Sequence, residues 1–196
     1  MQTLAERDLR QEWGTGDYQI IYADPPWAYR DKAASGKRGA SFKYDCLTVE
    51  DIGTFEIDGL HVSQIAAKNS ALFLWSTGPM MKEARWVMGA WGFAYKNIAF
   101  TWVKRTKHDK LHWGMGNYTR SNPEFCLLGI RGKMKRQSAS VHSIIEAPVG
   151  KHSAKPPEAR DRIVRLFGDL PRIELFARER ALGWDADGLE LGVNDA

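Results

Sequence analysis

Apolar residues along this chain gather into short runs that alternate between the spacing of strands and the spacing of helices. Strand-like runs cover residues 18–23, 71–75, 97–103, 125–130, 140–147 and 172–177. Helical spacing covers residues 49–53, 79–91 and 156–167. Strands that alternate with helices predict an α/β fold, with a mostly parallel sheet that carries helices on both faces. In such folds, ligands bind beyond the carboxyl ends of the strands.

Two of the predicted helices carry boundary signals. Before residues 79–91, Thr77 is a candidate N-cap and Pro79 suits the first helical turn. Gly92 follows that helix, and Gly168 follows the helix at 156–167, as expected where a helix ends.

The first strand runs directly into Asp24-Pro25-Pro26-Trp27. Two prolines fix φ and remove two backbone donors, so we expect the carbonyls of Asp24 and Pro25 to lack local partners and to face a ligand. A carboxylate, a carbonyl and the aromatic plane of Trp27 suit a flat base that carries an exocyclic amine. The alternative is a turn that merely ends a strand, because Asp and Pro are common turn residues.

This tetrapeptide resembles the catalytic motif of S-adenosylmethionine-dependent amino-methyltransferases, and with its tryptophan it is similar to the MT-A70 family of N6-adenine methyltransferases. Further segments that resemble this family are residues 71–78, 122–129, 152–158, 174–178 and 183–185. The resemblance implies a Rossmann-like class I methyltransferase fold, circularly permuted so that the catalytic half precedes the cofactor half. That order accounts for the absence of a glycine-rich G-x-G loop after the first strand.

The resemblance also implies roles for individual residues. The catalytic residues would be Asp24, Pro25, Pro26 and Trp27, and the substrate-binding residues Tyr44, Asn122, Glu124 and Lys155. The cofactor, S-adenosylmethionine, would contact Asp24, Lys155, Glu174, Phe176, Arg178, Arg180 and Glu190. At Gly188-Leu189-Glu190 the chain departs from the family, which usually carries Asn in place of Leu189. Leu189 cannot bind a ribose hydroxyl, whereas Glu190 still can.

Two of these residues have simpler alternative interpretations. Lys155 precedes a predicted helix, where an ammonium can attract ligand oxygens, but it could also be solvated, with Ser153 capping the helix. Glu124 could accept from the base or pair with Lys155 in a structural salt bridge. His152 lacks partners at ligand spacing, so we predict no metal.

Residues 28–47 and 104–122 are predicted to be substrate or gate loops. Their basic residues are candidates for contact with a nucleic-acid backbone: Arg30, Lys32, Lys37, Arg38, Lys104, Arg105 and Lys107. The alternative is an ordinary solvated surface.

Composition is compatible with this interpretation. The 196 residues suit a single methyltransferase domain with an N-terminal helical extension at 1–16, and the net charge of +4 favours an anionic partner. Cys46 and Cys126 form no metal pattern, and no apolar run reaches membrane-spanning length, so we expect a cytoplasmic protein.

The sequence therefore predicts transfer of a methyl group from S-adenosylmethionine to the N6 amine of adenine in DNA. RNA is the close alternative as substrate. A non-catalytic nucleic-acid-binding subunit of the same fold is the second alternative, and a homodimer or a heterodimer with a related subunit is plausible from the resemblance.

Overall fold

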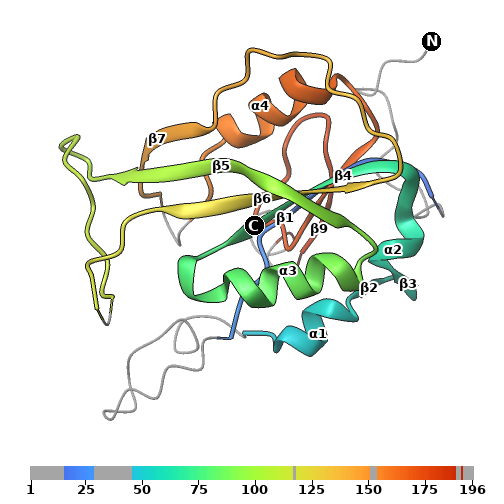
Figure 1. Cartoon of the computed structure of the whole chain (residues 1–196), viewed down its shortest axis with the longest axis horizontal. Coiled ribbons are helices and arrows are strands. Elements are labelled where there is room, and N and C mark those ends of the chain that lie inside the picture. The colour runs from blue at the N-terminus through green and yellow to red at the C-terminus, as the bar shows by residue number, and fades with distance from the viewer. Residues whose placement is uncertain (1–15, 29–45, 117, 151–153, 189–190, 192–196) are drawn as a thin grey trace.

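The computed structural model describes residues 16–28, 46–116, 118–150, 154–188 and 191 (Figure 1). Its centre is a seven-stranded sheet in the order β7-β5-β6-β4-β1-β8-β9. The strands are β1 (Tyr18–Ala23), β4 (Ala66–Ser76), β5 (Ala94–Arg105), β6 (Glu124–Arg131), β7 (Ile144–Pro148), β8 (Arg172–Leu175) and β9 (Asp185–Asp187). Only β6 runs against the others, because it pairs antiparallel with both β4 and β5 while the remaining pairs are parallel. The predicted mostly parallel sheet is confirmed.

Successive residues of the central strands supply two separate cores. Ile21 and Leu72 face a core shared with α1 (Val49–Gly53), α2 (Val62–Ile65) and α3 (Met81–Ala90). Ile20 and Phe73 face the opposite core, which α4 (Glu158–Phe167) covers. Figure 1 shows α4 on one side of the sheet and α3 with α1 on the other. Helices therefore cover both faces, as the sequence predicts for an α/β fold.

The last two strands, β8 and β9, extend the sheet beyond β1 to its edge. Strand β8 pairs in parallel with β1, from Ile20 opposite Arg172 to Ala23 opposite Leu175. Asp24 and Phe176 consequently leave adjacent strands at the same edge. This placement agrees with a Rossmann-like fold in which the catalytic half comes first and the cofactor half comes last.

Several predicted boundaries are corrected. The strand predicted at 140–147 begins only at Ile144, because Ser138 and Ser140 bond to each other in a local turn instead of a ladder. The last predicted strand ends at Leu175, since Phe176 has a φ of 59° that a strand does not allow. A short 3-10 turn, Gly78–Met80, precedes α3, and the Thr77 side chain makes no capping bond.

Short elements between α1 and β4 were not predicted from the sequence. The two-residue strands β2 (Glu56–Ile57) and β3 (Leu60–His61) form a hairpin closed by Asp58 and Gly59, both with positive φ. Two residues are too few to show a strand period. The predicted helical extension lies outside the described residues, apart from Gly16. In the part of the chain that the structure describes, no helix is long and apolar enough to cross a membrane.

Candidate active site

The turn after β1 is folded tightly on itself. The Pro25 carbonyl accepts a bond of 2.9 Å from the backbone N–H of Trp27, and the Pro26 carbonyl accepts one of 2.9 Å from Leu47. The prediction that the Pro25 carbonyl lacks a local partner is therefore wrong, because Trp27 is the first residue after the prolines that has an N–H to donate. A carbonyl oxygen has two lone pairs, so Pro25 keeps the capacity for one further bond.

Trp27 anchors this turn to the sheet. Its side chain is only 5% exposed, and its indole N–H donates to the backbone carbonyl of Trp75 at 3.0 Å. The ring packs among the apolar side chains of the core that α1, α2 and α3 share, and its stacking on a base stays a prediction. The indole bond holds the turn that begins at Asp24 against β4.

Two lysines and two carboxylates from distant parts of the chain meet beside this turn. The Lys155 ammonium lies 2.6 Å from an Asp24 oxygen and 3.1 Å from a Glu124 oxygen. Lys104 pairs with the other Glu124 oxygen. These four side chains, here called the ionic cluster, are between 10% and 15% exposed. The alternative in which Lys155 is solvated is wrong, and the alternative in which Glu124 pairs with Lys155 is confirmed.

The charges in the ionic cluster sustain one another. Burial alone would raise the pKa of Glu124, but Lys155 and Lys104 outweigh it and hold the pKa below its ordinary value. Burial would likewise lower the pKa of Lys155, but Asp24 and Glu124 outweigh it and raise the pKa. Glu124 is therefore an acceptor at neutral pH. Lys155 keeps three N–H donors, of which the cluster uses two.

Lys104 belongs to this site and not to the surface, which corrects its predicted role at a nucleic-acid backbone. Its ammonium lies 5.1 Å from the centre of the Trp102 ring and pairs with Glu124. Arg105 is also engaged, at 2.6 Å from Glu146. Lys107 is exposed, and its contact with a nucleic-acid backbone stays a prediction. The other predicted backbone contacts lie outside the described residues: Arg30, Lys32, Lys37 and Arg38.

Asn122 has a structural task instead of the predicted contact with the substrate. Its side-chain oxygen accepts from the Lys104 N–H at 3.0 Å, and its amide nitrogen donates to the Lys104 carbonyl at 2.9 Å. The same nitrogen also donates to the His112 carbonyl. Both amide hydrogens are used, so Asn122 braces the end of β5.

The predicted cofactor residues gather where β8 ends. Glu174 is 7% exposed, and both of its oxygens pair with Arg160 of α4, at 2.6 and 3.1 Å. Burial raises the pKa of Glu174, and Arg160 only partly offsets this effect. Phe176 packs against Phe55, with ring centres 4.4 Å apart. Arg178 is half-buried and Arg180 is exposed, whereas Tyr44 and Glu190 lie outside the described residues.

The structure adds residues that the sequence analysis did not select. Asp187 ends β9 half-buried, and burial together with the nearby Asp58 carboxylate raises its pKa. A Cβ on Gly188 would lie 2.1 Å from the Ala177 carbonyl, so the backbones after β8 and β9 touch here. Asp187 ends a strand beside the predicted cofactor strand. That position identifies Asp187 as a candidate site residue only once the pairing of β8 with β9 is known.

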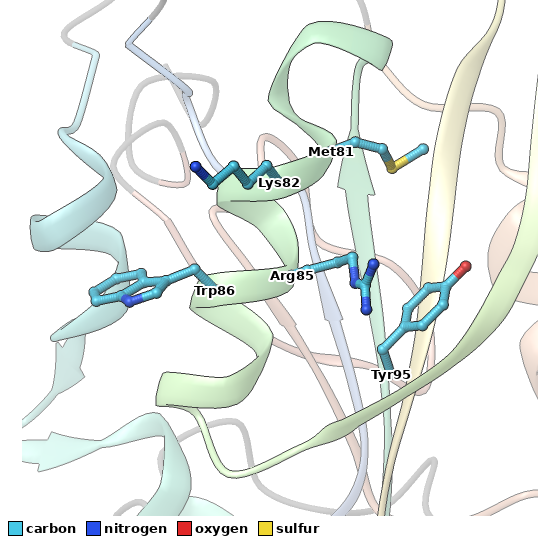
Figure 2. A pocket seen from close by; sticks show the side chains of 5 residues that line it. All are labelled: Met81, Lys82, Arg85, Trp86 and Tyr95. Carbon is cyan, nitrogen blue, oxygen red and sulfur yellow. The ribbon is translucent and has the colours of Figure 1, made fainter.

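A shallow groove lies apart from this site, over α3 and the start of β5 (Figure 2). Arg85 and Tyr95 point toward each other there, with the guanidinium carbon 4.8 Å from the ring centre, whereas Trp86 points toward α1. None of the residues predicted for the site lines this groove. Among the described residues, no group of three or more His, Cys, Asp or Glu side chains is placed to hold a metal ion.

Comparison with known proteins relates this chain to methyltransferases. The family model described as MT-A70 matches residues 18–190. The Type II methyltransferase M.MunI of Mycoplasma sp is 37% identical in an alignment that covers 90% of this chain and 79% of that protein. The N(6)-adenosine-methyltransferase MT-A70-like protein of Arabidopsis thaliana is 27% identical over 90% of this chain but only 24% of its own length. The N6-adenosine-methyltransferase non-catalytic subunit MTB of the same plant is 29% identical over 74% of this chain and 18% of its own length.

Proposed function

The chain belongs to the MT-A70 family, and from that premise we propose that it transfers a methyl group from S-adenosylmethionine to the N6 amine of adenine in DNA. The observation that carries this proposal is the carboxylate of Asp24, held at the end of β1 by Lys155 at 2.6 Å. A fixed carboxylate beside a carbonyl with spare capacity suits the two hydrogens of an amine.

The chemistry assigns a small number of roles. The adenine amine donates one hydrogen to Asp24 and the other to the free lone pair of Pro25. These bonds draw the amine nitrogen toward tetrahedral geometry. Its lone pair is then less delocalised into the ring and is available to attack the methyl group. Asp24 need not be a strong base, since the proton can leave after the transfer. The larger effect is positioning in a half-buried, poorly hydrated site.

Lys155 and Glu124 would read the remaining edge of the base. The third N–H of Lys155 is free to donate to a ring nitrogen, and ionised Glu124 can only accept. Adenine presents an amine donor next to a ring acceptor, which matches this arrangement. Guanine presents a carbonyl next to a ring N–H, so it places an acceptor opposite the Asp24 carboxylate. We include Tyr44 in the same base pocket.

The cofactor would lie along the edge where β8 and β9 end. When bound, S-adenosylmethionine supplies an electrophilic methyl group on a positively charged sulfur. Its ribose hydroxyls need acceptors, which Asp187 and Glu190 can provide, and its carboxylate needs a cation such as Arg178. Among the described residues, Asp187 offers an acceptor and Arg178 a cation near this edge, and these two residues fit the group. Glu174, Phe176 and Arg180 complete the proposed cofactor site, with Arg160 holding Glu174 in place.

DNA is the preferred substrate because identity to the Type II methyltransferase, at 37%, exceeds identity to the plant adenosine methyltransferase, at 27%. RNA is the second candidate, since the plant relatives are named for adenosine. A non-catalytic subunit is a third, because one relative carries that name. The complete ionic cluster disfavours the third. We further propose a single methyltransferase domain that acts in the cytoplasm, alone or as a homodimer or heterodimer.

The test measures transfer of labelled methyl from S-adenosylmethionine to duplex DNA, single-stranded DNA and RNA. Asp24→Ala is the inactive variant, and Lys68→Met, an exposed lysine of β4, is the matched control. Incorporation into one polymer that is lost only in Asp24→Ala supports the proposal and selects the substrate. Absence of transfer together with absence of cofactor binding would favour the non-catalytic subunit.

A further inference from the structure

The loop between β5 and β6 holds most of its large apolar side chains in water. Leu111, Trp113, Met115 and Tyr118 are 40%, 60%, 81% and 102% exposed. They make up half of the eight exposed large hydrophobic residues that the described part of the chain contains. Apolar groups clustered in this way usually mark a binding site. We call these four side chains the apolar loop cluster.

The loop that carries them has a defined shape. The Gly114 N–H donates to the Ser121 carbonyl at 2.7 Å, and the His112 N–H donates to the Lys104 carbonyl at 2.9 Å. A Cβ on Gly116 would lie only 1.9 Å from the Thr119 carbonyl, so the tip closes backbone against backbone. Figure 1 shows the loop extending past the ends of β5 and β6. Backbone contacts therefore hold the described parts of the loop that carry the apolar side chains.

The base of this loop is part of the active site. Asn122 bonds to the backbone of Lys104 and to the His112 carbonyl, and Glu124 of the ionic cluster follows two residues later. The loop that carries the apolar loop cluster therefore leaves the active site at Lys104 and returns to it at Glu124.

The charge of the loop favours an anionic partner. Lys107, Lys110 and Arg120 are exposed, and the carboxylate of Asp109 faces Arg105 at 3.9 Å. Cations that alternate with exposed aromatic groups match a phosphate backbone and stacked bases. A purely apolar protein partner would leave these cations unmatched.

We propose that the apolar loop cluster is a wedge that enters duplex DNA at the target adenine and fills the gap in the stack when that base leaves it. This inference rests on the proposed function. The ionic cluster is only 10–15% exposed, so an adenine still paired within a duplex cannot reach Asp24. The base must leave the helix, and apolar side chains inserted between base steps make that possible.

The test compares one target adenine in two settings. A duplex that the wild-type protein methylates is set beside the same duplex without the base opposite that adenine. We expect Trp113→Ala and Met115→Ala to lower kcat/KM about tenfold or more on the intact duplex, because the cost of unstacking is no longer offset. On the duplex with the missing base, they should stay within about twofold of wild type, since that adenine leaves the stack with little cost. Trp86→Ala is the control, an exposed tryptophan outside the loop, and should be unchanged on both duplexes.

Other outcomes overturn the wedge. An equal loss of kcat/KM on both duplexes would mean that the loop only binds DNA. An unchanged kcat/KM on both duplexes would mean that the loop has no part in catalysis. A fluorescent adenine analogue at the target position supplies a readout without methyl transfer. Its emission should rise when wild type binds and should stay low with Trp113→Ala. If the wild-type protein methylates neither duplex and binds no duplex, the proposed function itself is wrong. If the wild-type protein is active and the variants match it on both duplexes, only the wedge is wrong.

Discussion

Replacing Lys155 with methionine removes one positive charge from the ionic cluster while keeping nearly the same side-chain length. Asp24 loses its partner at 2.6 Å, whereas Glu124 loses the contact at 3.1 Å but retains Lys104. Breaking a buried ion pair by removing one partner costs about 3–5 kcal/mol. Since these side chains keep 10–15% exposure, we expect the lower limit, about 3 kcal/mol in the free energy of unfolding.

For a domain of this size, that loss corresponds to a fall in Tm of roughly 6–12 °C. Activity should fall further than stability alone explains, because Asp24 is no longer held against the amine. A displacement of the reacting geometry by about 1 Å can cost roughly 100-fold in rate. The assay pairs thermal unfolding with kcat/KM at a temperature where the variant is folded. Lys68→Met, on an exposed lysine, is the control and should change neither quantity.

A double-mutant cycle with Asp24→Asn separates the pair from other effects. Residues in direct contact should show a coupling energy of about 0.5–3 kcal/mol. Unchanged Tm and unchanged kcat/KM in Lys155→Met would show that Lys155 does not hold Asp24 in place. A coupling energy of zero between the two residues would show the same.

Three further predictions follow from other parts of the site. The pKa of Glu124 is lowered in the folded protein, so the ionised carboxylate stabilises the fold above the ordinary carboxyl pKa, and this stabilisation is lost as the pH falls through the folded-state pKa. Glu124→Gln should therefore weaken the dependence of the unfolding free energy on pH in the acid range. An unchanged dependence in that range would contradict the role given to Glu124. Arg160→Met should destabilise the fold by about 3 kcal/mol and weaken S-adenosylmethionine binding in calorimetry, since Glu174 loses both contacts; intact affinity would place the cofactor elsewhere. Gly188→Ala should cost about 1–3 kcal/mol and lower cofactor affinity, because the new Cβ meets the Ala177 carbonyl, whereas Gly89→Ala, with open space around it, should do neither.

Local patterns predicted the parts of the fold that depend on local order. The apolar run at Tyr18–Ala23 and the helix at Val49–Gly53 lie where the sequence places them. Strand β7 and the end of β8 were misplaced, because the serine turn and the positive φ of Phe176 leave no mark on apolar periodicity. The β2–β3 hairpin is too short for any period to appear.

Within the site, the sequence named the groups but, apart from the pairing of Glu124 with Lys155, not the contacts between them. Asp24 and Lys155 are 131 residues apart, and only the sheet brings them together. Lys104 was assigned to a nucleic-acid backbone because it lies in a segment rich in basic residues. A buried carboxylate at Glu124 without a partner would be costly, and Lys104 supplies that partner. Trp27 and Asn122 were assigned to the ligand, whereas their polar hydrogens bind the backbone.

The most direct test of the proposed methyl transfer to adenine is the chemical identity of the methylated nucleoside. Duplex DNA is incubated with the protein and S-adenosylmethionine, digested to nucleosides and analysed by mass spectrometry, with Asp24→Ala in parallel. We expect N6-methyladenine with wild type and none with Asp24→Ala. Methyl groups on cytosine, or N6-methyladenine formed equally well by Asp24→Ala, would show that the proposed function is wrong.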